Sequence, residues 1–470
     1  MTFTKGAGHD PRLLDQARQL VASSGAAGAA RAVERLVAAN EAWRGRGCVN
    51  LIAAESPTSP AARRLLSAEV GTRGSGGHIG ETNRSFAGMR YIDELEAICV
   101  ELLKTLFSAG HADHRLLGGM AGCVVAAGAL AGHGDTVMSI PPRFGGDSSS
   151  RQDGPPGALG MRIVDIPFTP DGLAIDLEAF QATAERHRPR LVSLGQALTL
   201  FPLPVERLRS VVSPWGGRIY FDGAHQAGLI AGRRYPNPLD EGAAILTGSS
   251  GKTLSGPQGG VIAWNDDELT PVITQRIFPT LTGSHQVNRV AALAVTCAEL
   301  LEYGPAYMGD TVENARALAT ALHERGFEVL GAGRGFTATH QILVDVRPFG
   351  TGYQVAAHLQ EANIIVNRML LPCDRDDDDA EPSGIRLGTV EVTRLGMGPD
   401  EMRTIATWMS RLLMERESPQ AVRDEVIQLR DAFQTLYYCF EAGLPRRDEP
   451  PGQAATGLAG PPATPPDRGG

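Results

Sequence analysis

The sequence has few cysteines, no long apolar run and no excess of basic residues, and each absence excludes a class of protein. Its six cysteines are scattered and form no CxxC pair, which argues against a disulfide framework or a zinc site. The longest apolar stretch, residues 123–132, is too short to cross a bilayer. The net charge of −9 argues against nucleic acid or an anionic membrane as the main partner, and the N-terminus lacks the apolar core of a signal peptide. We therefore expect a soluble cytoplasmic protein.

The length of 470 residues exceeds what one compact core accommodates and predicts two domains with appendages. Residues 95–290 alternate helical patterns with short apolar runs, an order typical of an α/β fold whose mostly parallel sheet is covered on both faces. The segment that follows predicts a smaller α+β unit, in which residues 290–304 and 312–326 read as two separate helices. The predicted organisation is an N-terminal helical arm over 1–50, a large domain over 51–290, a small domain over 291–418, an extra helix over 419–441 with its helical pattern at 424–440, and a disordered tail over 442–470.

Two segments of the predicted large domain have residues that suit an aldehyde cofactor. Lys252 lies among small polar residues after a predicted strand, and a lysine in a confined site can lose its proton and attack an aldehyde. Asp222 ends the predicted strand 218–222, at the edge where open α/β sheets bind ligands, and its carboxylate could keep a pyridine nitrogen protonated. The alternatives are a solvated loop lysine and an aspartate that caps a helix. His225 could be a core histidine bonded to the backbone.

Two further segments suit the anionic ends of a cofactor and its substrate. Gly118 and Gly119 precede a helix of small residues, whose free N–H groups could bind a phosphate. Arg386 follows the acidic run 374–382, and a guanidinium is a natural partner of an α-carboxylate, although alone it reads as a surface arginine. The acidic run reads as a solvated loop, with a metal site as the minor alternative. Together the four segments supply what a pyridoxal 5'-phosphate (PLP) enzyme needs: an amine, a partner for the pyridine nitrogen, a phosphate site and a carboxylate site.

The sequence resembles the serine hydroxymethyltransferases, which are fold-type-I PLP enzymes. Segments similar to successive motifs of that family occur in the same order: LIAAESPTSP (51–60), MRYIDELE (89–96), GDTVMS (134–139), FDGAHQAGLIAG (221–232), GKTLSGPQGG (251–260), IFPTLTGSHQ (277–286) and SGIRLGTVEVTRLG (383–396). The resemblance covers roughly residues 45–415. It implies an α/β fold with a mostly parallel seven-stranded large domain and a smaller C-terminal α+β domain. It also implies a homodimer with shared active sites.

The resemblance further implies roles for individual residues. Lys252 would form the Schiff base with PLP, Asp222 would pair with the pyridine nitrogen, and His225 would lie near the phenolic oxygen of the cofactor. Arg386 would bind the substrate carboxylate. The residues around the phosphate would be Gly118, Gly119 and Ser249, with Gly283 and Ser284 from the second subunit. The residues assigned to the substrate pocket are Glu55 and Phe86.

Several positions depart from the family pattern, and they concern the groups that face the side chain and folate. Asp147, the last residue of an FGGD segment, replaces the histidine that stacks on the cofactor ring, and Phe144 could stack instead. His78 aligns best with the glutamate that serves folate-linked proton transfer, and Glu81 is the other candidate. The remaining replacements are Ser85 and Phe86 for paired tyrosines, Gly251 for a histidine, Met120 for a serine, and Ala54 for a serine.

The kept cofactor groups and the changed folate groups predict a relative with altered chemistry that works without tetrahydrofolate. The first version is aldol or transaldol chemistry at the Cα–Cβ bond of a β-hydroxy amino acid or glycine. The second is β-elimination, as in a C–S lyase, or decarboxylation-coupled oxidative deamination of a cysteine S-conjugate or similar amino acid in a biosynthetic pathway. His78 is the expected acid–base group in either version. A non-catalytic scaffold is a third interpretation, and the retained Lys252 argues against it.

Overall fold

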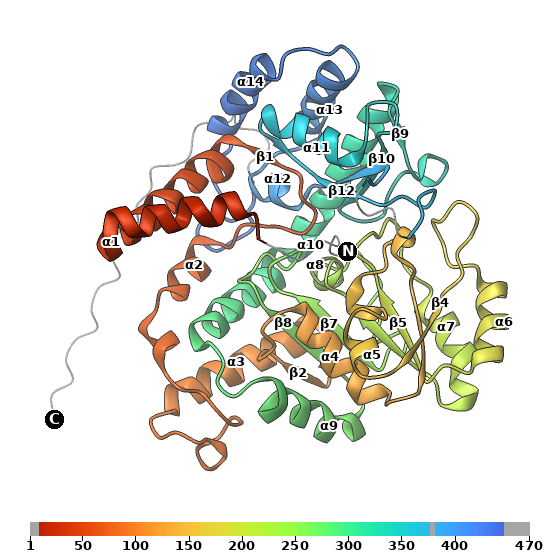
Figure 1. Ribbon diagram of the computed structural model, residues 1–470. Helices are drawn as coiled ribbons and strands as arrows, with labels where there is room; N and C mark the ends of the chain where they lie inside the picture. The colour runs from red at the N-terminus through yellow and green to blue at the C-terminus, as the bar shows by residue number, and fades with distance from the viewer. Residues whose placement is uncertain (1–8, 377–380, 446–470) are drawn as a thin grey trace, which may run out of the picture.

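The computed structural model describes residues 9–376 and 381–445, and its larger sheet has seven strands in the order β2-β8-β7-β6-β5-β3-β4 (Figure 1). The strands are β2 (His111–Asp113), β3 (Thr136–Ser139), β4 (Arg162–Asp165), β5 (Leu191–Gly195), β6 (Arg218–Asp222), β7 (Ile245–Ser249) and β8 (Gly260–Trp264). All neighbours from β4 to β7 pair in parallel, and β8 is antiparallel to both β7 and β2. The predicted mostly parallel seven-stranded sheet is confirmed. Strand β2 was not anticipated, because three residues are too few to show a periodic pattern.

Helices cover both faces of this sheet, which explains why its central strands are apolar runs rather than alternating ones. β5, β7 and β8 are buried along their whole length. The helices around the sheet are α3 (Arg90–Phe107), α4 (Gly119–Leu130), α5 (Pro155–Ala158), α6 (Leu177–His187), α7 (Val205–Val212), α8 (Ala227–Ala231) and α9 (Thr270–Gln275). The apolar side chains of α4 and α9 form the core on one face, and those of α3, α6, α7 and α8 form the core on the other.

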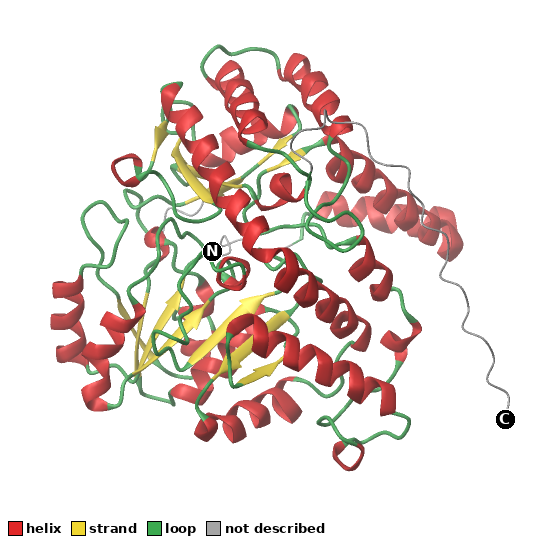
Figure 2. Ribbon diagram, turned by 180° about the vertical axis from the view of Figure 1, so that it is seen from behind, coloured by secondary structure: helices red, strands yellow, loops and turns green. Residues whose placement is uncertain are grey.

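A single long helix, α10 (Val287–Glu324), contributes to the cores of both sheets (Figure 2). Leu293 in its first half packs in the core of the large sheet, and Leu318 in its second half packs in the core of the small one. The sequence predicted two separate helices here, over 290–304 and 312–326, and Gly304 and Pro305 lie where the first of them was expected to end. That prediction was wrong, and the helix continues through both residues.

The small sheet is antiparallel, with the strand order β12-β13-β10-β9. Its strands are β9 (Glu328–Val329), β10 (Gln341–Asp345), β12 (Asn367–Met369) and β13 (Gly384–Gly388), and its helices are α11 (Gly352–Glu361), α12 (Val390–Arg394), α13 (Pro399–Leu413) and α14 (Pro419–Ala432). A separate parallel pair joins β1 (Val49–Asn50) to β11 (Ile364–Ile365), which attaches the segment after the N-terminal arm to the small unit. The helix predicted over 424–440 begins earlier and ends at Ala432, so its second half was wrong.

The N-terminal arm is α1 (Pro11–Asn40), capped by Asp10 and followed by a π-helical turn at Glu41–Arg46 and by α2 (Pro60–Leu66). Most of α1 is exposed, and Figure 1 shows it along the outside of the molecule. Most of the predicted disordered tail (446–470) and the centre of the acidic run (377–380) lie outside the described residues. Among the described residues, no helix has the length and apolar composition that crossing a membrane requires.

Candidate active site

Two charged side chains lie at or just after the C-terminal ends of adjacent strands. Asp222 is the buried last residue of β6, and Lys252 follows the end of β7 by three residues. One oxygen of Asp222 accepts a hydrogen bond from the Ala224 N–H (3.0 Å), and the other accepts one from the Cys123 thiol (3.3 Å). Within the described residues, its hydrogen-bond partners are thus uncharged. A buried carboxylate of this kind can receive a cationic ring nitrogen.

The electrostatics of this pair follow mainly from burial. Burial raises the pKa of Asp222, and the positive charge of Lys252 opposes that shift. Burial also lowers the pKa of Lys252 below its ordinary value of 10.5, an effect that Asp222 opposes and Arg386 reinforces. The neutral amine is the nucleophilic form of lysine, so this environment favours attack on an aldehyde.

Arg386 reaches the same place from β13 of the small sheet and is only 4% exposed. Its Nη1 donates a hydrogen bond to the Ala197 carbonyl and lies 3.4 Å from Nε2 of His225, while its Nε donates to the side-chain oxygen of Asn367 (3.2 Å). Burial lowers the pKa of Arg386 to about 10, and Asp147 opposes this shift. The guanidinium therefore stays charged at neutral pH and can bind an anionic group between the two sheets.

The N-terminus of α4 offers free backbone N–H groups beside the end of β7. Gly118 is the N-cap residue in an extended conformation, and no side chain caps the first turn. A Cβ on Gly119 would lie 3.7 Å from the Cβ of Ser249, so the helix start and the strand end are adjacent. Backbone N–H groups, the helix dipole and a buried serine hydroxyl together suit a phosphate.

Asp147 also faces these groups, because its charge influences the pKa values of Lys252, Asp222 and Arg386. Its side chain accepts a hydrogen bond from the Ser149 N–H (3.0 Å), which holds it at the start of a short 3₁₀ turn. The ring of nearby Phe144 stacks on Phe168, with centroids 4.6 Å apart and planes at 15°.

Comparison with known proteins agrees with this arrangement. The family model of serine hydroxymethyltransferase matches residues 31–409. The chain belongs to the serine hydroxymethyltransferase family. It is 42% identical over 418 residues to the serine hydroxymethyltransferase of Methanopyrus kandleri, covering 89% of this chain and 97% of that one. It is 40% identical over 396 residues to that of Archaeoglobus fulgidus, covering 84% and 90%.

The fold is also similar to a crystal structure of L-threonine transaldolase from Pseudomonas fluorescens, with a TM-score of 0.80 and 24% identity over 91% of this chain and 96% of that chain. It is the fold-type-I architecture of PLP enzymes. The cofactor of this serine hydroxymethyltransferase family member is PLP. The residues fit it: an amine with a lowered pKa, a buried carboxylate with uncharged partners, and an uncapped helix N-terminus.

Several residues expected at the site from the family pattern lie on the surface of the single chain. His78 is exposed, with its Nδ1 3.4 Å from Nη1 of Arg115 and its ring edge-on to Phe278 at 5.4 Å. Burial lowers the pKa of His78, and the charge of Arg115 adds to the effect. Gly283 and Ser284 are exposed as well, and the Ser284 hydroxyl accepts a hydrogen bond from the Ser75 N–H (3.1 Å), in the loop that holds His78 (the His78 loop, residues 73–80).

The two residues assigned to the substrate pocket also have other contacts. Glu55 forms an ion pair with Arg44 (2.5 Å) and accepts a hydrogen bond from Asn50 (3.1 Å). Phe86 is 50% exposed. The side chain of Glu81, the alternative to His78, lies outside the described part of the structure.

Sequence reasoning missed three residues of the site. Cys123 and Ser149 both lie next to the Asp222 carboxylate, with the serine hydroxyl 3.5 Å away. Gln341 donates a hydrogen bond to Nδ1 of His225 (3.1 Å). None of the three shows a local sign of its contact, although Cys123 lies in the small-residue helix that follows Gly119, and only the fold brings them to the site.

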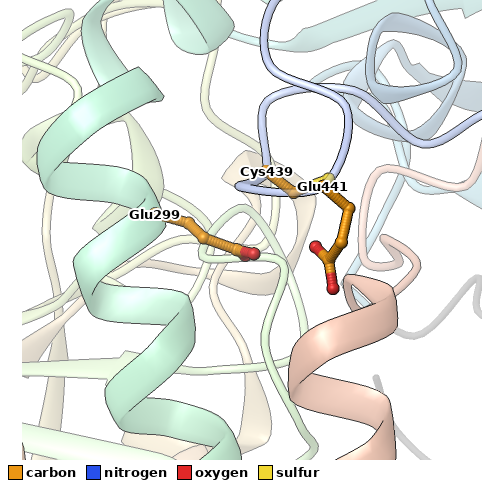
Figure 3. Close-up of side chains that lie close together, drawn as sticks. All are labelled: Glu299, Cys439 and Glu441. Atoms are coloured by element: carbon orange, nitrogen blue, oxygen red, sulfur yellow. The ribbon is translucent and has the colours of Figure 1, made fainter. Parts of the chain in front are cut away.

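A second group of polar side chains lies away from this site (Figure 3). One ligand atom each of Glu299, Cys439 and Glu441 lies within 4.8 Å of the others. Arg394 pairs with Glu299 (3.5 Å), and Arg64 pairs with Glu441 (3.1 Å). Because each carboxylate has its own guanidinium, the charges balance without a metal ion, and we assign the group to two ion pairs, one between α12 and α10 and one between α2 and the segment after α14.

Proposed function

We propose that this chain is a PLP-dependent transferase that breaks or forms the Cα–Cβ bond of a β-hydroxy amino acid or glycine without folate. The observation that supports it most directly is the approach of Arg386, from the small sheet, to His225 and Lys252, from the large one. A buried guanidinium near the lysine that would hold the PLP aldehyde selects a substrate with both an amino group and a carboxylate.

The residues of the site would bind different parts of the cofactor and the substrate. Lys252 would hold PLP covalently, Asp222 would bind its ring nitrogen, and Gly118, Gly119 and Ser249 would bind its phosphate. Bound PLP supplies an electron sink for negative charge at Cα. Arg386 holds the substrate carboxylate and so fixes the orientation of the Cα bonds. Burial lowers the pKa of the Lys252 amine, which makes its neutral, proton-accepting form easier to reach.

Independence from folate is proposed from the replaced groups. Where the family pattern has paired tyrosines, Ser85 and Phe86 remove both phenol groups, and the Phe86 ring is half-exposed. Where it has a ring-stacking histidine, Asp147 places a carboxylate near Lys252. The pKa of His78 is lowered, so its imidazole is neutral at pH 7 and can accept a proton.

A homodimer with shared active sites is part of the proposal. Large apolar side chains of α3 and of the segment just before α4 face the surface of the single chain: Tyr91 is 73% exposed, Ile98 59% and Leu117 57%. Gly283 and Ser284 are exposed close to the His78 loop. A second copy packed on this face would cover the apolar side chains and could bring His78, Gly283 and Ser284 to the site of its partner.

The test is product analysis of the purified PLP-loaded protein with threonine, serine, glycine plus an aldehyde, and cysteine S-conjugates, each with and without tetrahydrofolate. We expect threonine to give glycine and acetaldehyde at a rate that tetrahydrofolate does not change. Lys252→Ala is the inactive control. Pyruvate and ammonia from a cysteine S-conjugate would instead identify β-elimination, and carbon dioxide with an aldehyde would identify oxidative decarboxylation. Rapid serine–glycine exchange only with tetrahydrofolate would refute folate independence.

A further inference from the structure

Gln341 lies in the first position of β10 and is fully buried against the candidate active site. Its side-chain oxygen accepts a hydrogen bond from the Thr199 N–H (2.8 Å), and its side-chain nitrogen donates to the Ala197 carbonyl (3.1 Å). A backbone N–H can only donate and a carbonyl can only accept. The two backbone groups therefore fix which end of the amide is nitrogen, without reference to the histidine.

The same amide nitrogen lies 3.1 Å from Nδ1 of His225. Because an amide nitrogen is only a donor, Nδ1 of His225 must accept, and it cannot hold a proton of its own. A neutral imidazole has one proton, so that proton must be on Nε2. Burial lowers the pKa of His225 well below 6.5, and the charges of Lys252, Arg386 and His340 add to this shift. A hydrogen bond with the Ala53 carbonyl opposes it. The His225 ring is therefore neutral at pH 7.

We propose that Gln341 is a positioning residue that holds His225 as its Nε2–H tautomer and thereby presents one N–H donor to the bound cofactor and substrate. Nε2 lies 3.4 Å from Nη1 of Arg386. Because Nε2 of His225 and Nη1 of Arg386 both hold protons, the contact between them is not a hydrogen bond. The imidazole and the guanidinium are instead neighbouring donors for an anionic ligand oxygen. The Ala197 carbonyl accepts from both Gln341 and Arg386, so one backbone group orients the supports of both donors.

The environment of His225 limits how else the tautomer could be set. His340 stacks on His225, with centroids 5.8 Å apart and planes at 19°, but its Nε2 is engaged 3.2 Å from the Ala53 carbonyl. It therefore contacts the His225 ring through its face. Gln341 is the hydrogen-bond partner of Nδ1 in the described structure. The tautomer of His225 is set within the cofactor site, whichever substrate the enzyme uses.

The test is ¹⁵N NMR of histidine-labelled, PLP-loaded protein, which distinguishes a protonated ring nitrogen from an unprotonated one. The signal of His225 among the 11 histidines is assigned from its loss in His225→Gln. We expect Nδ1 of the wild-type protein to be unprotonated at pH 7 and Nε2 to be protonated. A protonated Nδ1 in the wild-type protein would overturn the proposal without any variant.

The decisive variant is Gln341→Glu, which keeps the shape of the side chain but places a carboxylate against Nδ1. A carboxylate can only accept, so Nδ1 should become protonated, and the pKa of His225 should rise by about one to three pH units. The matched control is Gln226→Glu, the same change at a buried amide next in sequence that forms no described hydrogen bond with the His225 ring, and Nδ1 should stay unprotonated. If Nδ1 stays unprotonated in Gln341→Glu, or becomes protonated in both variants, Gln341 does not set the tautomer.

Discussion

A pH-dependent stability is expected from Glu391, which lies in α12 directly after the strand that holds Arg386. Its carboxylate accepts a hydrogen bond from the side-chain nitrogen of Asn50 (2.6 Å), which also donates to Glu55 (3.1 Å). Burial raises the pKa of Glu391 from 4.5 to about 7, Asn50 and Arg430 oppose the shift, and the nearby charge of Glu55 adds to it. The side-chain amide of Asn50 thus bonds the carboxyl groups of both Glu391 and Glu55, and the more buried Glu391 keeps its proton to a higher pH than usual.

The magnitude follows from that shift. In the window between pH 4.5 and about 7, the unfolded chain has lost this proton while the folded chain keeps it. The group therefore contributes stability that is fully present below pH 4.5 and is lost as the pH rises through about 7. At 1.36 kcal/mol per pH unit, the whole effect is about 3 kcal/mol, an upper limit because part of the residue reaches the surface.

Glu391→Gln keeps an oxygen that can accept from Asn50 but cannot ionise. We expect the free energy of unfolding of the variant, relative to that of the wild type, to increase by about 2–3 kcal/mol between pH 5 and pH 8. Urea unfolding followed by tryptophan fluorescence at both pH values measures this difference. Glu302→Gln, at an exposed position on α10, is the matched control and should leave the pH dependence unchanged. Parallel stability curves for the wild type and Glu391→Gln would refute the argument.

Three further predictions concern the site itself. Lys252→Ala should abolish the visible absorbance of protein-bound PLP after desalting, because the covalent link is lost; retained colour would mean another attachment. Asp222→Asn should raise the Kd of PLP by about 10- to 100-fold, since a hydrogen bond to a charged group contributes about 1.5–3 kcal/mol, and fluorescence titration measures it. Arg386→Lys should raise the KM of the amino acid by a similar factor while the PLP absorbance stays the same, because only the bidentate carboxylate contact is lost; an unchanged KM would place the carboxylate elsewhere.

The placement of Asp222 and Lys252 could be predicted from the sequence because local patterns determine it. A short apolar run ending in aspartate predicts a buried strand whose last side chain lies at the ligand-binding edge, and the structure has Asp222 there. Gln341 could not be predicted in this way. It meets a histidine 116 positions earlier in the chain, through a contact between the two sheets, and a glutamine that starts a strand shows no local sign of it. Cys123 meets Asp222 across 99 positions for the same reason.

The error at α10 has a similar origin. Glycine followed by proline normally ends a helix, since proline lacks an N–H and its ring clashes with the preceding turn. Here Gly304 lies against Gly232 of the large unit, where a Cβ on either residue would meet the other within 3.6 Å, and the helix packs on both sides of this point. Tertiary packing overrides the local preference, and the sequence pattern does not include that packing.

Helix α10 contributes side chains to the cores of both sheets. Unfolding of either the large or the small unit would therefore expose side chains that the other unit needs buried. Loss of order around Leu318 would remove the support of the strand that presents Arg386, and loss of order around Leu293 would loosen the sheet that presents Asp222. We expect calorimetry of the cofactor-free protein to show one cooperative transition, with the amine, the acid and the guanidinium of the site lost together.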